Sequence, residues 1–244
     1  MSHQYRFLGH RLPGDREQWK IVGEEARHLK KVVRLKEGDQ VEVFDGKGSY
    51  AEGLVEFRES NVFVRISSSG FEKSPGQKLV LGVGALKPGF VDDLLPSLTE
   101  LGMQEIHIFL QEGVSKTRLQ EKTRLRWEKI LVSAAKQCKC NYLPEVSCWP
   151  SLSEFLGHLQ GRFSRGFYLQ PGATRDFLRE LQETGQESGL CAVVGSEKGF
   201  SPDESRLLGD SFLLPVSLGP LVLRAYTATL SAGVLLSASR RCNP

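Results

Sequence analysis

The chain has 244 residues, with 32 Lys and Arg against 29 Asp and Glu, and a net charge of +3. A chain of this length predicts one large domain or two small ones. Its 40% hydrophobic and 25% charged residues are typical of a globular protein and exclude a collagen-like, coiled-coil or wholly disordered chain. The first fifteen residues lack the apolar core of a secretory signal, and the longest apolar stretch, 79–86, is far shorter than the roughly 20 residues that span a bilayer. We therefore expect a cytoplasmic protein.

The amino-terminal part of the chain reads as short β-strands. Residues 41–44, 54–57 and 62–66 are β-branched or aromatic and are separated by Gly, Asp, Ser and Asn, a pattern typical of a small antiparallel unit. The following segment, 67–78, is rich in Ser, Gly and Lys and contains a Pro, so it is the predicted linker. We therefore expect one domain over residues 1–70 and a second over 71–244.

The second domain has the pattern of an α/β fold. Apolar strand-like runs alternate with helix-like segments, which predicts a mainly parallel sheet. One helix is predicted from an apolar stripe at spacings of three and four between Trp127 and Cys138. Another is predicted from Ser201, Pro202 and Glu204, which form a capping box directly after GSEKGF. The strand-like runs are 79–86, 106–110, 166–169, 190–194 and 212–216.

Basic residues gather in two places. Residues 111–142 carry eight basic and three acidic side chains, a local charge of +5, which predicts a phosphate-binding surface. A solvated helix face gives the same pattern, because charge runs on helices are common. His28 lies in a second basic cluster with Lys30, Lys31 and Arg34, which a surface helix would also explain.

Two strand ends are candidate ligand-binding segments. The run 190–194 leads into residues 195–200 and the capped helix, so free backbone N–H groups would face the sheet edge where open α/β folds bind ligands. A structural turn is the alternative. The spacing matches neither GxGxxG nor GxxxxGK[ST], which disfavours a dinucleotide-dependent dehydrogenase and an ATP-binding loop. The run 212–216 leads into 217–224 and a helix rich in Ala, Ser and Gly, suited to a subunit interface or to a monomer's core.

The remaining polar residues form no hydrolytic or metal-binding motif. The five His are scattered, and neither GxSxG nor HExxH occurs. The cysteines lack paired CxxC spacing, so we expect reduced thiols and no metal site. Of the close pair Cys138 and Cys140, one lies on the apolar stripe, which favours a structural role. The cysteines are Cys138, Cys140, Cys148, Cys191 and Cys242.

Six ordered stretches resemble one protein family and together extend over nearly the whole chain. They are similar to segments of bacterial small-subunit ribosomal RNA methyltransferase E, a family of the SPOUT class. The resemblance implies an enzyme that uses S-adenosyl-L-methionine to methylate N3 of a uridine in 16S ribosomal RNA. The stretches are HLKKVVRLKEGDQVEVFDGKG at 28–48, LGVGALKPGFVDDLLPSLTELG at 81–102, EGVSKTR at 112–118, WEKILVSAAKQCKCNYLPEV at 127–146, VVGSEKGFSPDE at 193–204 and LGPLVLRAYTAT at 218–229.

The resemblance also implies an architecture and partners. Residues 1–70 would form a PUA-like RNA-binding β barrel. Residues 71–244 would form a SPOUT methyltransferase domain with a deep trefoil knot, whose knot and cofactor site lie within about 166–240. Members of the family are homodimers, so the implied partners are 16S rRNA or the assembled small subunit, and a second copy of the chain.

The positions that match the family's segments are the predicted site residues. Arg224 is the predicted catalytic residue, a cation that would stabilise the uracil anion left when N3 loses its proton. The alternative is that Arg224 pairs with Glu197 and only stabilises the fold. The sequence identifies no general base. The predicted RNA-binding residues are His28, Lys31, Arg34, Lys116, Arg118 and Lys139. The predicted cofactor-binding residues are Leu169, Gln170, Pro171, Gly172, Gly195, Ser196, Glu197, Gly199, Leu218, Gly219, Leu223 and Arg224.

The chain departs from the family's motifs at five positions. Ser196 and Lys198 replace Pro and Gly in the loop that usually reads GPEGG. Lys136 replaces a Glu, and Ala225 and Tyr226 replace Thr and Glu, so acids are lost close to the expected RNA-facing site. Two alternatives therefore stay open: a SPOUT methyltransferase with another RNA target, and a non-catalytic RNA-binding ribosome assembly factor.

Overall fold

The computed structural model describes residues 5–12, 17–74, 76–84, 89–111, 121–184 and 189–241. The chain divides into two compact units, one of residues 1–74 with 135–143 and one of residues 75–134 with 144–244. The sequence placed the boundary at residue 70 and assigned 135–143 to the second domain, whereas this segment packs with the first unit. It does so because Arg6 donates to the Ala135 carbonyl and the Leu143 N–H donates to the Gly46 carbonyl.

The first unit is built on a β-sheet with the strand order β1-β4-β5-β6-β3-β2. Strands β1 and β4 pair in parallel and the other neighbours are antiparallel. A short helix, α1 (Gly23–His28), continues into a π-helical turn, η1 (Leu29–Val33). The strands are β1 (Tyr5–Leu8), β2 (His10–Arg11), β3 (Gln18–Ile21), β4 (Gln40–Phe44), β5 (Ser49–Arg58) and β6 (Asn61–Phe71).

The predicted linker over 67–78 is wrong in its first part. Strand β6 continues to Phe71 and pairs with the first residues of β5, from Ser49 opposite Phe71 to Glu52 opposite Ser68. Gly53 permits this long pairing, because a Cβ there would lie 2.3 Å from the carbonyl oxygen of Arg65. Small Ser side chains are thus part of a strand here, where backbone pairing outweighs weak β-propensity.

The second unit is an α/β fold around a sheet of strand order β12-β10-β11-β7-β8-β9. Neighbouring strands all pair in parallel over the described residues, which confirms the predicted parallel sheet. Strands β8, β10 and β11 are buried at every residue and β7 at all but Lys78, which is why these strands read as apolar runs. Strand β9, at one edge, has no buried residue and was not predicted from the sequence. The strands of this sheet are β7 (Lys78–Gly84), β8 (Glu105–Phe109), β9 (Glu145–Trp149), β10 (Gly166–Leu169), β11 (Gly189–Val194) and β12 (Leu213–Val216).

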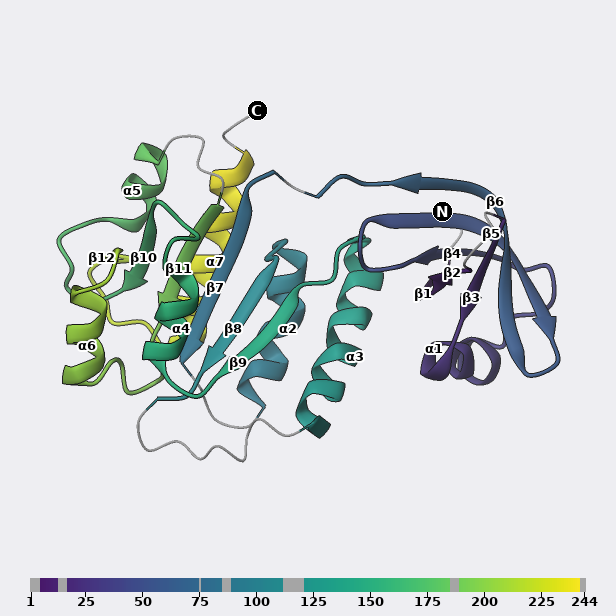
Figure 1. Cartoon of the computed structure of the whole chain (residues 1–244), viewed down its shortest axis with the longest axis horizontal. Coiled ribbons are helices and arrows are strands. Elements are labelled where there is room, and N and C mark those ends of the chain that lie inside the picture. The colour runs from purple at the N-terminus through teal and green to yellow at the C-terminus, as the bar shows by residue number, and fades with distance from the viewer. Residues whose placement is uncertain are drawn as a thin grey trace. The chain divides into compact units, whose positions relative to one another are not determined.

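Helices cover both faces of this sheet (Figure 1). Helices α2 and α5 both contact α7, while α4 and α6 pack together over the other face, where Phe155 of α4 stacks on Phe109 of β8. The predicted capping box of α6 is confirmed, with Ser201 and Glu204 each bonding the other's backbone. The helices are α2 (Phe90–Glu100), α3 (Glu121–Cys138), α4 (Leu152–Leu159), α5 (Phe177–Glu183), α6 (Pro202–Gly209) and α7 (Ala225–Arg241). Among the described residues, no helix is long and apolar enough to cross a membrane.

The small residues of α7 pack inside the chain. Ala232 is fully buried, and a Cβ on Gly233 would lie 3.1 Å from Leu98 and 3.2 Å from Leu101, both from the region of α2. The close approach predicted for this helix is therefore made to α2. Ala232 and Gly233 are core residues and do not present a surface to a second subunit.

Candidate active site

A cavity of about 700 Å³ opens at the carboxyl edge of the parallel sheet. This volume is typical of a small-molecule site, and the carboxyl edge is where open α/β sheets bind ligands. The walls are formed by the segments that follow β10, β11 and β12, together with the start of α7 and Phe90 at the start of α2. Three strand ends that are distant in sequence thus meet at one place.

Most of the predicted cofactor-binding residues line this cavity. Gly172 and Gly219 do not line it, although they lie in the same segments, with φ angles of 79° and 132° that suit turns. The residues that line it are Leu169, Gln170, Pro171, Gly195, Ser196, Glu197, Gly199, Leu218, Leu223 and Arg224. The segments named from the sequence therefore meet at one cavity, and most of the residues predicted in them face it.

Backbone hydrogen bonds tie the first and third of these segments together. The Gln170 N–H donates to the Val216 carbonyl at 2.9 Å. Beyond β12, the Ser217 N–H donates to the Arg175 carbonyl at 2.8 Å, and the Phe177 N–H donates to the Ser217 carbonyl at 3.0 Å. These bonds fix the walls of the cavity independently of side-chain identity.

The middle segment, 195–199, is a tight turn. The Gly199 N–H donates to the Ser196 carbonyl at 2.9 Å, and the Lys198 N–H donates to the Ser196 hydroxyl at 3.3 Å. A Cβ on Gly195 would lie 3.1 Å from the Gly199 backbone, tighter than most such contacts, so glycine lets the two ends approach without displacing each other. The family's Pro and Gly at 196 and 198 are thus replaced in a turn that still closes.

Arg224 and two aromatic residues stand at one wall. Arg224 is exposed, lies directly before α7 and accepts a backbone hydrogen bond from Ala228 at 2.9 Å. Phe90 and Tyr226 both line the cavity, with ring centroids 5.5 Å apart and planes at 88°. Phe90 was missed by the sequence analysis, since a Phe at a helix start has no pattern of its own; Tyr226 stood out only as a departure from the family motif.

The predicted RNA-binding residues fall in different parts of the chain. His28 ends α1, Lys31 lies in η1, and Arg34 follows η1 with a φ of 60°; all are exposed. Lys139 follows α3, is exposed and has a φ of 57°. Lys116 and Arg118 lie outside the described residues.

Lys136 has partners within the first unit. Its Nζ pairs with Glu25 at 2.9 Å and lies 4.9 Å from the centroid of the Phe7 ring. The side chain that replaces the family's Glu is therefore held in the fold by an ion pair and a ring contact.

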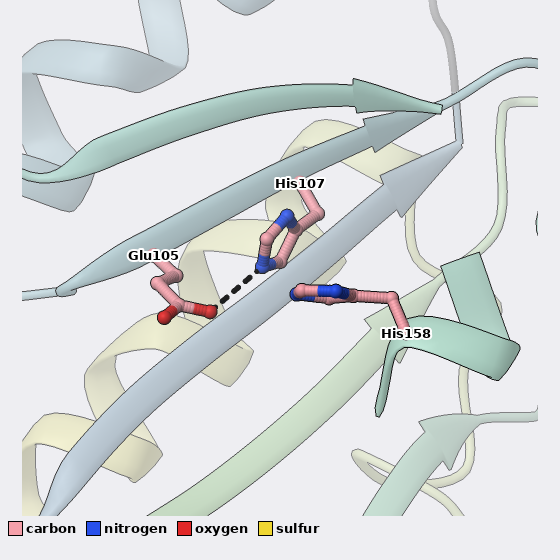
Figure 2. Close-up of side chains that lie close together, drawn as sticks. All are labelled: Glu105, His107 and His158. Atoms are coloured by element: carbon pink, nitrogen blue, oxygen red, sulfur yellow. Dashed lines mark hydrogen bonds and ion pairs between the residues drawn. The ribbon is translucent and has the colours of Figure 1, made fainter. Parts of the chain in front are cut away.

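A second polar cluster lies at the amino end of β8 (Figure 2). Glu105 and His107 are two residues apart on β8, and His158 comes from α4; their ligand atoms all lie within 4.8 Å of one another. His107 Nε2 is 2.9 Å from the Glu105 carboxylate, and the Trp149 indole N–H donates to His107 Nδ1 at 3.1 Å. Because Nδ1 accepts a hydrogen bond, the proton of a neutral His107 lies on Nε2 and is donated to Glu105.

Cations occupy the side of Glu105 where a metal ion would bind. Arg162 donates to both carboxylate oxygens at 2.8 and 3.0 Å and also contacts His158, and Lys78 forms an ion pair with Glu105. Burial alone would raise the pKa of Glu105, but hydrogen bonds from His107, Arg162 and Lys78 outweigh it and hold the pKa well below its usual range. The cluster is a satisfied ion-pair network and does not suit a dication. Among the described residues, Cys138, Cys140, Cys148 and Cys191 form no disulfide bond.

Comparison with known proteins identifies the family of this chain independently of the structure. The sequence model of the RNA methyltransferase domain matches residues 72–237, which is more than half of the chain. The chain belongs to the RNA methyltransferase family. The model of the RNA methyltransferase PUA domain matches residues 21–59, within the first unit.

Two curated relatives of this RNA methyltransferase are named ribosomal RNA small subunit methyltransferase E or E 1. The chain is 26% identical to ribosomal RNA small subunit methyltransferase E 1 of Borreliella burgdorferi over 89% of this chain and 91% of that protein. It is 27% identical to ribosomal RNA small subunit methyltransferase E of Bacillus subtilis over 87% of this chain and 86% of that protein. The resemblance predicted from the sequence is confirmed.

Solved structures share the fold. A methyltransferase from Legionella pneumophila, solved with the bound cofactor S-adenosylmethionine, superposes with a TM-score of 0.84 at 25% identity over 97% of this chain and 98% of that one. Ribosomal RNA small subunit methyltransferase E from Neisseria gonorrhoeae superposes with a TM-score of 0.82 at 22% identity over 97% and 98% of the two chains.

Proposed function

We propose that this RNA methyltransferase transfers a methyl group from S-adenosyl-L-methionine to N3 of a uridine in 16S ribosomal RNA. The observation that carries the proposal is the cavity at the carboxyl edge, where the three segments that resemble the family's cofactor loops meet. Relatives named ribosomal RNA small subunit methyltransferase E support the substrate, and a structural neighbour with bound S-adenosylmethionine supports the cofactor.

The residues present fit such a cofactor. The cavity is lined by apolar side chains, among them Leu169, Val194 and Leu218. The backbone of the turns and the charged residues Glu197 and Arg224 also line it. A volume of about 700 Å³ accommodates a nucleoside with an amino-acid tail. S-adenosyl-L-methionine, when bound, supplies the methyl group on its sulfonium sulfur.

In the reaction, the chain itself has to position the uracil and to stabilise the uracil anion. The N3 proton of uracil must leave before N3 can accept a methyl group, and Arg224 is placed to stabilise the resulting negative charge on the ring. Correct placement of the two reactants supplies much of the rate. A base must be unstacked to enter the cavity, and Phe90 and Tyr226 offer an aromatic surface for it.

Binding of RNA is assigned to the first unit and to basic residues beyond it. The exposed side chains of His28, Lys31, Arg34 and Lys139 are proposed phosphate contacts, and Lys116 and Arg118 are proposed from the sequence alone. The match to an RNA methyltransferase PUA domain over 21–59 supports a role for this unit in binding RNA. The partner is then 16S rRNA or the assembled small subunit.

A trefoil knot and a homodimer complete the proposal. The bonds of Ser217 to Arg175 and Phe177, which bring the chain after β12 against the segment after β10, support the knot. Leu221 and Val222, which line the cavity and are 77% and 79% exposed, support a partner subunit close to the site. Sedimentation of Leu221→Asp tests the dimer, because a charge at a covered position should give monomers.

In vitro methylation tests the function. Small subunits and naked 16S rRNA from a strain that lacks this protein would be incubated with the enzyme and labelled S-adenosylmethionine, and the modified base would be located by mass spectrometry. We expect one N3-methyluridine in 16S rRNA. Absence of label from 16S rRNA, with label in total RNA of the same strain, would indicate a methyltransferase with another target. Failure to bind S-adenosylmethionine in calorimetry would favour the assembly factor.

A further inference from the structure

Gln111 touches both ends of the 195–199 turn without lining the cavity. It lies just beyond β8 and is 8% exposed. Its Oε1 accepts the Ser196 N–H at 2.7 Å, and its Nε2 donates to the Gly199 carbonyl at 3.0 Å and to the Glu204 carboxylate at 2.7 Å. One side-chain amide thus binds the beginning of the turn, its end and the first turn of α6.

Few side chains other than an amide offer this set of groups. The three partners need one acceptor and two donors on a short planar group, which a primary amide provides. A carboxylate at position 111 would accept from Ser196 but would face the carbonyl of Gly199 and the carboxylate of Glu204. A thioether could make neither of the part-buried hydrogen bonds to the Ser196 N–H and the Gly199 carbonyl, and the loss of both would weaken the hold on the turn.

The neighbouring strand makes room for this amide. A Cβ on Gly84, at the end of β7, would lie 2.5 Å from Gln111 Oε1 and 2.6 Å from the Ser196 nitrogen. Neither distance is possible for a real side chain, so glycine at position 84 is a condition for the contact. The ends of β7, β8 and β11 are therefore built around one hydrogen-bonded group.

The amide determines which groups of the turn are left for a ligand. It takes up the Ser196 N–H and the Gly199 carbonyl, while Ser196, Glu197 and Gly199 still line the cavity. We propose that Gln111 is a positioning residue that sets the affinity for S-adenosyl-L-methionine by holding the 195–199 turn in its ligand-ready shape. This inference rests on the proposed cofactor.

Calorimetry with S-adenosylmethionine tests the role. Gln111→Met keeps the size of the side chain and removes all three hydrogen bonds. We expect the Kd for S-adenosylmethionine to rise by about 10-fold to 100-fold, because a displaced turn can no longer present its backbone correctly. The matched control is Arg162→Met, which breaks the network at the other end of β8; it should lower the melting temperature and leave the Kd unchanged.

The outcomes separate the inference from the proposed function. If the wild type does not bind S-adenosylmethionine, the proposed function fails. If the wild type binds it and Gln111→Met binds equally well, Gln111 has only a structural role and the inference is overturned. An equal rise in Kd for Arg162→Met would also overturn it, because general destabilisation would then explain both variants.

A charge swap tests the contact should Gln111→Met fail to fold. Gln111→Glu alone places two carboxylates together and should raise the Kd by more than 10-fold. Adding Glu204→Gln restores a donor opposite position 111, so the double variant should recover at least half of that loss on a logarithmic scale. No recovery in a folded double variant would show that the Gln111–Glu204 contact does not position the turn.

Discussion

The two ends of strand β8 carry polar clusters of opposite kinds. At the amino end, Glu105 is surrounded by His107, Lys78 and Arg162, so charged side chains satisfy one another. Just beyond the carboxyl end, Gln111 is neutral and binds the backbone of a turn that lines a cavity. In the first cluster charged side chains satisfy one another, whereas the second holds in place a turn that lines a cavity.

The contrast shows that a strongly shifted pKa is not by itself a sign of an active site. The pKa of Glu105 is held well below its usual range although the carboxylate lies away from the cavity. Shifted pKa values gather at functional sites, but structural ion-pair networks shift them as well. In this sheet the position of a cluster indicates its role, because the loops at the carboxyl ends of parallel strands converge on one place. The carboxyl end of β8 should therefore govern activity and the amino end stability.

The largest effect is expected for Arg224→Ala at the carboxyl edge. Loss of a cation that stabilises the uracil anion should lower the methylation rate at saturating substrate by about 10²-fold to 10³-fold. Binding of S-adenosylmethionine should weaken much less, because the contact acts mainly in the transition state. Single-turnover kinetics measure the rate, and Arg206→Ala, which alters an exposed arginine of α6, is the control. An unchanged rate would remove Arg224 from the mechanism.

At the amino end, Glu105→Gln should affect stability alone. Lys78 and Arg162 would lose their carboxylate, and we expect a loss of about 2 to 3 kcal/mol in the free energy of unfolding, measured with urea at pH 7. A carboxylate whose pKa is lowered by folding stabilises above its ordinary pKa and loses that effect in acid, so the difference should shrink as the pH falls below about 4. A variant that is stable at pH 7 but has lost methylation would contradict the division between the two ends.

Variants of Tyr226 test how the carboxyl edge of the sheet binds the uracil. The proposed role of Tyr226 is to offer its ring to the uracil, so Tyr226→Phe should keep most of the activity. Tyr226→Ala should lose about 10-fold, because base stacking on an aromatic ring is lost next to Phe90. Steady-state methylation of both variants gives the comparison. A Phe variant as inactive as the Ala variant would show that the hydroxyl is essential.

Lys139 in the first unit offers a test away from β8. Lys139→Gln should flatten the slope of log K for RNA against log salt by about 0.7 to 0.9, the effect of losing one phosphate contact. The affinity for S-adenosylmethionine should not change. If Lys116, Arg118 and Lys139 are all replaced by Gln and the slope stays the same, the placement of the RNA contacts is wrong.

The smallest effect is expected for His158 at the amino end. Burial lowers the pKa of His158, Arg162 and His107 lower it further, and Glu105 and Glu145 oppose them. Since the unfolded chain then binds a proton more readily than the folded chain, stability should fall as the pH drops below about 6.5. Unfolding by urea between pH 8 and 5 should show a weaker decline for His158→Gln. Parallel curves would show that His158 titrates normally.

Local patterns predicted those parts of the fold that depend on neighbours in sequence. The run 166–169 is β10, and Ser201 with Glu204 begins α6 as expected, because capping uses residues three apart. The Ser-rich segment 67–71 was misread, since its strand pairing is decided by β5. The sequence left two roles open for the small residues of α7, because only the fold shows that Gly233 meets α2.

The site was predicted unevenly for the same reason. The three cavity segments follow apolar strands and carry recognisable turns, so their residues could be named in advance. Gln111 could not, because its partners lie 85 to 93 residues away and a lone Gln has no motif. The only sequence signal for Gln111 was its place, as a polar residue close behind a buried strand. No sequence signal marked Phe90.

The segment 135–143, which packs with the first unit, makes that unit discontinuous. Buried Arg6 donates to the Ala135 carbonyl and to Asn141, and the Leu143 N–H donates to the Gly46 carbonyl. During synthesis the amino-terminal unit therefore cannot complete its hydrogen bonds until residue 143 has left the ribosome, by which time more than half of the chain has been translated. This RNA methyltransferase therefore completes its amino-terminal unit late in its synthesis.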